Sequence, residues 1–292
     1  MGSLAVTEFT DPGCPWAYSA SPSFAVLQWR YGEQLRWRIV AIGLTEDPQR
    51  YIDAGYTPTR MVLGNMMFAR RYRMPFACAP RPRVAATSRG CRAIVATRLL
   101  DPQRERAVLR ALQFAWFTSA LQLDEDDQLA QALEPVDGLD VAAVIAAIDD
   151  ERTLDAYQQD KSLARTAEGS PTHFQGKARQ TDGPVRYSAP SLRFESEDGT
   201  RLEAGGFQPV EAYDVLIANL DRTLERRDPP EQPLHALRAF PAGLATQEVA
   251  AIMAPNNQPP DRDAAEAALV ELLGEGAARR RALGNDALWQ PA

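Results

Sequence analysis

The N-terminal part of the chain has the hydrophobic pattern of a strand, a helix and a second strand. Residues 4–11 are rich in β-forming side chains and alternate little, as expected of a strand covered on both faces. Residues 16–31 place apolar side chains at helical spacing, and Gly32 is available to end the helix. In residues 34–44 apolar and basic positions alternate, which predicts a second strand. Together these segments predict a βαβ unit.

A long block rich in Ala and Leu interrupts this α/β pattern. Between residues 57 and 169 apolar side chains recur at helical spacing, so we expect a helical domain inserted into the α/β unit. The α/β pattern returns with strands around residues 188–195 and 201–203 and a helix over 209–226. The helices expected in the insert cover residues 83–100, 105–119, 126–133 and 141–147.

The C-terminal part of the chain follows a boundary. Residues 226–233, RRDPPEQP, are a charged, proline-rich linker that cannot continue a helix. Three short helices and a hairpin come next, which is the outline of a winged helix, and Thr246 is the expected N-cap of the second helix. These helices are expected over residues 234–240, 246–253 and 263–274. The predicted domains are residues 1–56 with 170–228, residues 57–169, and residues 232–292.

Composition and charge limit the cellular compartments and the classes of binding partner that we expect for this chain. The chain has 292 residues and a net charge of -7, which favours solubility and repels polyanions. It has no run near the roughly 18 apolar residues of a membrane span, and its N-terminus lacks the pattern of a secretory signal. We therefore expect a cytoplasmic protein without a membrane partner. Residues 232–292 carry five arginines and seven acidic residues, so a nucleic-acid partner is not expected.

The cysteines and histidines exclude two classes of site. Cys14, Cys78 and Cys91 are odd in number and widely spaced, which argues against a disulfide framework and suits a reducing compartment. His173 and His235 stand far apart, and no Cys/His pair has the spacing of metal ligands, so we expect no metal site. Any cysteine with a special role is therefore reactive or simply buried.

Cys14 stands in the segment TDPGCPWAYS, where the first helix is expected to begin. The unpaired amides of a helix N-terminus stabilise a thiolate, so the pKa of Cys14 is expected to fall. Pro15 suits the first helical position because its missing amide would be unpaired there in any case. We expect Trp16 to line a substrate groove or to pack in the core, and Tyr18 or Ser19 to donate a hydrogen bond to a thiolate or an oxyanion.

This segment and three others resemble the DsbA branch of the thioredoxin-like fold, which includes 2-hydroxychromene-2-carboxylate isomerases and kappa-class glutathione transferases. The resemblance rests on FTDPGCPW, the helical insert, SAPSL and GGFQPVEAYDVLIANL, and it spans roughly residues 4–226. It implies an α/β thioredoxin-like fold with an inserted helical domain, here followed by a small winged-helix-like domain. It also implies that Pro190, after Ala189, is a cis-proline facing Cys14. The alternative is an ordinary trans proline at an edge strand. The thiol-binding residues implied by the resemblance are Pro15, Trp16, Ala17, Tyr18, Ala189 and Pro190.

The chain departs from the family's redox motif at one position. Redox members usually have C-P-x-C, whereas Ala17 stands at the fourth position here. Dithiol cycling at this motif is therefore in doubt, and a route with one thiol remains, in which an external thiol releases Cys14. Cys78 or Cys91 could act as a resolving thiol if the insert folds over the site, and the alternative is that both are buried or incidental.

Three functions follow from these observations. The first is a thiol oxidoreductase or thiol-transferase that uses Cys14 with a low-molecular-weight thiol such as glutathione or mycothiol. Carboxylates on such a ligand would suit the basic run at residues 70–73, which a solvated helix face explains equally well. The second is a thioredoxin-like adaptor that binds a protein partner without redox turnover. The third is a glutathione-dependent isomerase. A homodimer and the role of the C-terminal domain are left open.

Overall fold

Strand β1 (Leu4–Thr10) is an inner strand of the main sheet. In this computed structural model, which describes residues 2–181 and 183–292, β1 pairs in parallel with β2 (Leu35–Ala41) and antiparallel with β3 (Ser191–Glu195). Strand β4 (Arg201–Gly205) pairs antiparallel with β3 and completes the order β2-β1-β3-β4.

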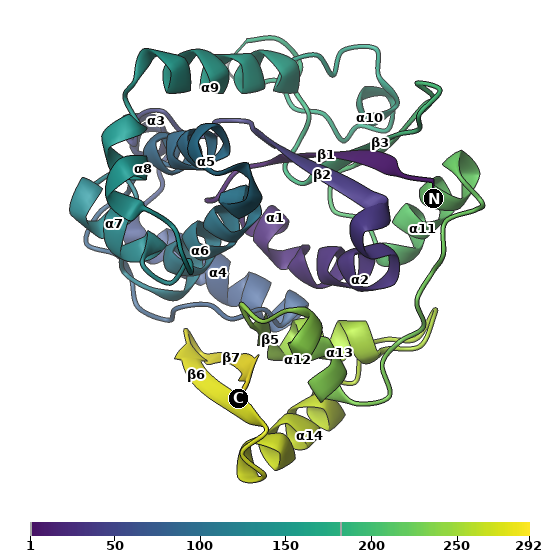
Figure 1. Cartoon of the computed structure of the whole chain (residues 1–292). Coiled ribbons are helices and arrows are strands. Elements are labelled where there is room, and N and C mark those ends of the chain that lie inside the picture. Colours follow the sequence, from purple (N-terminus) through teal and green to yellow (C-terminus); the bar gives the residue numbers. More distant parts are fainter. Residues whose placement is uncertain (1, 182) are drawn as a thin grey trace.

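Helices cover both faces of this sheet (Figure 1). On one face, α2 (Ser21–Tyr31) and α11 (Val210–Leu220) pack against the side of β1 that carries Leu4 and Val6. On the other face, the end of α9 (Glu151–Ala164) packs against Phe9. Burial on both faces explains why the sequence of β1 alternates so little.

The predicted helix over residues 16–31 is two helices. The first, α1 (Pro15–Ser19), has Ala20 as its C-cap, and Ala20 is also the N-cap of α2. Pro22 lies in the first turn of α2, where its missing amide costs nothing, and in a continuous helix the same proline would remove a hydrogen bond. A short 3-10 turn at Gly32–Gln34 then leads into β2.

The insert is helical, as the sequence predicts, and its apolar side chains form a core that also includes Tyr18 of α1, Ile39 of β2 and three residues of the C-terminal part. Two of its helices match the predicted ranges, whereas the helix expected over residues 83–100 begins at Ser88. The later helix expected over residues 209–226 ends at Leu220. The elements between β2 and β3 are α3 (Gln49–Asp53) and α10 (Pro171–Phe174), which flank the insert, and within it α4 (Pro58–Tyr72), α5 (Ser88–Leu100), a 3-10 turn at Pro102–Arg104, α6 (Glu105–Thr118), α7 (Asp126–Leu133), α8 (Val141–Ala147) and α9.

The C-terminal part has the predicted order of helices and strands. A three-stranded antiparallel sheet in the order β5-β7-β6 packs with three helices, and the assignment to the winged-helix class stays a prediction. Thr246 is not the N-cap of its helix: the N-cap is Ala245, and the Thr246 hydroxyl donates a hydrogen bond of 2.9 Å to Asp286 instead. The elements are α12 (Pro233–Ala239), β5 (Leu244–Ala245), α13 (Thr246–Met253), α14 (Arg262–Gly274), β6 (Ala278–Leu283) and β7 (Asp286–Pro291).

The C-terminal part packs against both α2 and the insert. Figure 1 shows α13 next to α2, and Trp29 of α2 belongs to the apolar cluster of the C-terminal part. At the β6–β7 turn, Asn285 Oδ1 accepts a hydrogen bond of 2.8 Å from the Phe76 amide, and the Asn285 amide donates one of 3.0 Å to the Phe76 carbonyl. Gly284 is required beside it, because a Cβ there would lie 2.8 Å from the Phe76 carbonyl carbon.

A buried ion pair strengthens this junction. Both Glu248 carboxylate oxygens accept hydrogen bonds of 2.6 Å from the Arg110 guanidinium of α6, and Ser21 of α2 also donates to Glu248. Burial tends to raise the pKa of Glu248, but the Arg110 charge outweighs it and holds that pKa below its ordinary value.

In the described part of the chain, no helix is long and apolar enough to cross a membrane.

Candidate functional site

Cys14 lies between the end of β1 and the first turn of α1. It is the N-cap residue of α1, with extended backbone angles, and Pro15 follows it in the first turn. The Cys14 amide donates a hydrogen bond of 3.1 Å to the Asp11 carbonyl, which closes the turn. The Cys14 thiol donates to the Ala189 carbonyl oxygen, 3.2 Å from the sulfur. The site therefore joins two segments 175 residues apart in sequence.

The electrostatic state of Cys14 differs from the sequence expectation, which was a lowered pKa. The residue is only 5% exposed, and burial raises the pKa of its thiol to about 12. The amide of Ala17 acts in the opposite direction, although it forms no capping hydrogen bond to the sulfur. The expectation was wrong because it counted the helix amides and left out the loss of hydration, which is the larger effect here.

A buried carboxylate organises the turn before Cys14. Asp11 accepts hydrogen bonds from the amides of Gly13, at 2.9 Å, and Leu44, at 2.8 Å. Its second oxygen also accepts from the Thr87 hydroxyl, at 3.2 Å, and from the Cys91 thiol, at 3.3 Å. Burial raises the pKa of Asp11, and its four hydrogen bonds oppose that rise. Asp11 thus ties the cysteine turn to the segment after β2 and to the start of α5, a role that the sequence did not reveal.

Ala189 and Pro190 face Cys14 from the start of β3. The peptide bond between them is cis, and the Ala189 carbonyl is the group that the thiol contacts. Arg186 lies three residues earlier and is only 6% exposed, with its guanidinium donating 3.0 Å to the Tyr187 carbonyl. The Arg186 charge acts against burial to lower the pKa of Cys14. Arg186 was also missed, because nothing in its sequence context reveals that it folds back toward the cysteine.

Trp16 lies in an aromatic cluster at the surface of the site. Its side chain is 43% exposed, so the groove-lining alternative fits better than complete burial in the core. Its ring meets Phe68 edge-on with centroids 4.9 Å apart, and it also contacts Tyr72, at 5.7 Å, and Phe207, at 6.0 Å. These partners come from α4 and from the segment after β4, so α1, the insert and the main sheet meet at this ring.

Tyr18 does not lie at the sulfur, contrary to expectation. Its ring is fully buried against Phe117, and its hydroxyl donates a hydrogen bond of 2.8 Å to the Pro75 carbonyl. Tyr18 follows one helical turn after Cys14 and points into the insert, so its role is to fix α1 on the insert. Ala17, in the place of the family's second cysteine, is buried, as is Ser19.

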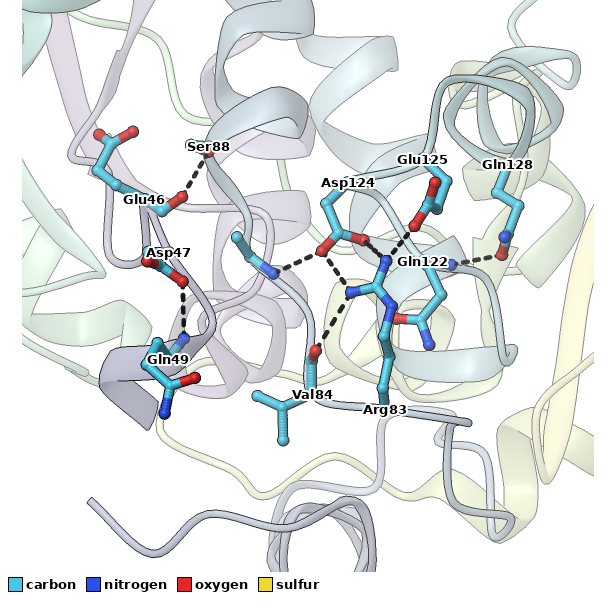
Figure 2. A network of polar contacts seen from close by, with 11 residues as sticks. Glu46, Asp47, Gln49, Arg83, Val84, Ser88, Gln122, Asp124, Glu125 and Gln128 are labelled. Atoms are coloured by element: carbon cyan, nitrogen blue, oxygen red, sulfur yellow. Dashed lines mark hydrogen bonds and ion pairs between the residues drawn. The ribbon is translucent and has the colours of Figure 1, made fainter. Parts of the chain in front are cut away.

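The other two cysteines form no disulfide with Cys14, since all three cysteines are free. Cys91 is buried in α5, where its thiol donates to Asp11. Cys78 is exposed in the segment before α5. Figure 2 shows how this segment is fastened: the Arg83 guanidinium binds both oxygens of Asp124, at 2.7 and 2.9 Å. At the start of α5, the Ser88 hydroxyl donates to the Glu46 carbonyl at 3.4 Å.

The structure brings only part of the basic run to the site. Arg71 and Arg73 line a groove together with Tyr72, the contact of Trp16, whereas Arg70 is exposed outside that lining. Within residues 2–181 and 183–292, no group of three or more His, Cys, Asp and Glu side chains is placed to hold a metal ion.

Comparison with known proteins identifies related sequences and folds. The family model described as a DSBA-like thioredoxin domain matches residues 5–188, which include β1, Cys14 and the helical insert. A search of the curated proteins found no match.

Several solved structures share the fold. The cytosolic disulfide reductase DsbM from Pseudomonas aeruginosa superposes with a TM-score of 0.54 at 19% identity, over 74% of this chain and 98% of that chain. The structure of DsbM with GSH gives 0.53 at 20% identity, over 74% and 98%. A Nitrosomonas europaea protein, provisionally named a protein disulfide isomerase, gives 0.55 at 16% identity, over 74% and 97%. At these identities the likeness establishes a thioredoxin-like fold of the DsbA type.

Proposed function

Because the chain belongs to the DSBA-like thioredoxin family, we propose that it is a thiol–disulfide oxidoreductase that works with the single sulfur of Cys14. One observation carries this proposal: the Cys14 sulfur lies at the first turn of α1 and 3.2 Å from the carbonyl that precedes the cis peptide bond. In this place a bound disulfide meets the sulfur from one side and the backbone of Ala189 from the other.

The proposed reaction consists of two exchanges. The Cys14 thiol gives its proton to solvent, and the thiolate attacks one sulfur of a disulfide RSSR. A bond forms between Cys14 and one RS group, and the other leaves as a thiolate that takes up a proton. An external thiol R′SH, as its thiolate, then attacks the mixed disulfide, which releases RSSR′ and returns Cys14 to the thiol. The external thiol is needed because Ala17 supplies no sulfur.

The co-substrate in this proposal is a low-molecular-weight thiol, glutathione or mycothiol, in the cytoplasm. Two facts about a structural neighbour support this assignment: DsbM is a cytosolic disulfide reductase, and one of its solved structures is with GSH. The pKa of about 12 implies that Cys14 rests as a thiol in the free protein. We therefore expect exchange to be faster in a complex, where the incoming disulfide takes the place of the S–H···O bond to Ala189.

The test is intact-mass analysis after incubation with glutathione disulfide. We expect one adduct in the Cys78→Ser background, which removes the exposed thiol, its loss when Cys14→Ser is added to that background, and its retention when Cys91→Ser is added instead. Reduced glutathione should then restore the original mass. An adduct of the same size in the double variant Cys14→Ser with Cys78→Ser, or none in Cys78→Ser, would remove the basis of the proposal.

A second function is favoured by the burial of the sulfur. A thiol that is 5% exposed and protonated near neutrality suits a protein-binding module of the same fold, for which Cys14 is only a buried side chain. In that case no small disulfide adds to Cys14 in the folded protein between pH 7 and 9, and the same mass experiment separates the two functions.

A further inference from the structure

A groove of about 630 Å³ lies beside the aromatic cluster of Trp16. Three parts of the fold form its walls: α2, the end of α4 together with the segment after β4, and residues 247–260 of the C-terminal part. Its volume falls in the usual range for small-molecule sites, roughly 300–1,000 Å³. The groove is therefore a ligand-sized space that exists only when the C-terminal part is in place.

The groove adjoins the cysteine site through two aromatic side chains. Tyr72 and Phe207 both line the groove, and both contact the ring of Trp16, which is two residues from Cys14. Tyr72 and Phe207 also contact each other, with centroids 4.7 Å apart. A ligand attached to the Cys14 sulfur thus reaches the groove by passing this aromatic cluster.

The C-terminal wall of the groove is held in position. The Asn256 side-chain oxygen accepts a hydrogen bond of 2.9 Å from the Arg30 guanidinium of α2, and it also accepts from Arg226. Arg30 and Arg226 both pair with Asp214 of α11. Because this network joins the loop after α13 to two helices of the main domain, the groove is formed before any ligand arrives.

The side chains of the groove indicate what it would bind. Arg71 and Arg73 are exposed, and neither has a carboxylate partner among the residues that the structure describes. Arg73 adopts a φ of 62° at the C-cap of α4, where a glycine would be easier to accommodate. On the opposite wall, Gln247 Oε1 is buried and has no hydrogen-bond partner in the described chain. The guanidinium groups of Arg73 and of Arg71, which lies over the Tyr72 ring, suit a carboxylate and outnumber the one acidic side chain of the lining, Glu211. An unpaired carbonyl oxygen suits an N–H or O–H donor.

We infer that this groove binds the part of a carboxylate-bearing, glutathione-type thiol that lies beyond its sulfur, and that residues 247–260 complete the site. The inference rests on the proposed function, in which such a thiol exchanges at Cys14. It gives the C-terminal part a task in ligand selection: Arg71 and Arg73 bind a carboxylate, and Gln247 accepts from an amide or amino group of the ligand.

The test measures binding apart from chemistry, with S-methylglutathione, which cannot form a disulfide. Calorimetric titration of the full chain should show that Arg73→Gln and Gln247→Leu each weaken binding about threefold to tenfold. The matched control is Arg70→Gln, which removes the same charge from the same helix end but lies outside the groove, and it should leave binding unchanged. The diethyl ester of S-methylglutathione lacks free carboxylates, so it should bind more weakly and should not respond to Arg73→Gln.

The outcomes separate this inference from the proposed function. Adduct formation at Cys14, combined with S-methylglutathione binding that Arg73→Gln and Gln247→Leu do not affect, would overturn the groove assignment and leave the oxidoreductase proposal in place. Absence of S-methylglutathione binding would also overturn it. Binding that depends on Arg73 and Gln247, in a protein whose Cys14 never forms an adduct, would support the groove and contradict the oxidoreductase.

Discussion

Cys14 is subject to opposing electrostatic influences, and their balance decides its chemistry. Burial is the largest and raises the pKa of the thiol, and the Asp11 carboxylate adds to it. The Ala17 amide and the Arg186 guanidinium act to stabilise the thiolate. Because the influences that favour the thiol are stronger, the free protein holds its sulfur protonated and bonded to the Ala189 carbonyl.

The pH dependence of alkylation at Cys14 checks this balance. We expect iodoacetamide to modify Cys14 slowly at pH 7 and about tenfold faster for each pH unit up to about 10, because the thiolate is the nucleophile. Peptide mass mapping measures the rate, and the exposed Cys78 in the same sample is the reference for reagent quality. A rate that levels off between pH 6 and 8 would contradict a raised thiol pKa.

Glu105 gives a second prediction at the level of one side chain. Burial raises the pKa of this carboxyl to about 7, Arg98 lowers it and Asp160 raises it. The folded state therefore binds the proton more tightly than the unfolded state, whose pKa is near the ordinary 4.5. The stability due to this proton is fully present below pH 4.5 and is lost as the pH rises to about 7.

Glu105→Gln should remove the loss of stability that occurs as the pH rises through the pKa of Glu105. We expect the variant to unfold with a free energy about 1–3 kcal/mol higher than the wild type at pH 8, because it carries no buried charge there. Arg98 keeps a partner, since it also contacts Asp160 at 3.1 Å. Urea unfolding followed by circular dichroism between pH 4.5 and 8 measures the difference, with the exposed Glu134→Gln as control. Equal pH profiles for wild type and Glu105→Gln would refute it.

The turn between β1 and α1 needs a glycine for lack of space. A Cβ at Gly13 would lie 2.3 Å from Thr87 Cγ2 and 3.2 Å from the Trp116 ring. Gly13→Ala should therefore lower the free energy of unfolding by about 1–3 kcal/mol through overpacking. Gly64 lies within α4 with nothing near its Cβ position, so Gly64→Ala should stabilise by about 0.5–1 kcal/mol. Thermal unfolding of both variants checks the contrast, and a neutral Gly13→Ala would contradict it.

Some helices of the insert were predictable from the sequence and others were not. The helices α7 and α8 match the expected residues: apolar positions recur at helical spacing in α7, and α8 is apolar throughout. The predicted helices left out α4, which is amphipathic but has no fully buried side chain, and the polar α9, which buries four. The cysteine turn was recognisable by its residues, but the burial that sets its pKa arises from packing against distant segments.

Across the whole molecule, the C-terminal part is a component of the structure and not a loosely tethered module. Its α14 exposes Asp263 and Glu271, and its one arginine, Arg262, is paired with Glu266 and Asp286. The β6–β7 turn, which in a winged helix would be the tip of the wing, contacts Phe76. The turn is therefore held against the rest of the chain, while Arg279, Arg280 and Arg281 of β6 stay exposed, and the expectation that no nucleic acid binds stays a prediction.

Variants of the ion pair Arg110–Glu248 test how much the contact between the insert and the C-terminal part stabilises the protein. Glu248→Gln leaves a largely buried guanidinium without its charged partner, so we expect a loss of about 3 kcal/mol in the free energy of unfolding. The double variant Arg110→Met with Glu248→Leu should recover most of that loss. Glu266→Gln, at the surface pair with Arg262, is the matched control and should change stability by less than about 0.5 kcal/mol. Chemical denaturation measures the free energy of unfolding of each variant. Equal losses in Glu248→Gln and Glu266→Gln would show that the buried pair contributes no more to stability than the surface pair.

The two hydrogen bonds between Phe76 and Asn285 have a consequence for the order in which the protein folds during translation. The two residues are 209 positions apart, and N-terminal segments emerge and fold first at about 5–20 residues per second. The main sheet and the insert can therefore assemble on the ribosome while the last wall beside the cysteine is still being synthesised. If the groove selects the thiol as inferred above, a nascent chain has its sulfur in place before residues 247–260, which complete that groove, have left the ribosome.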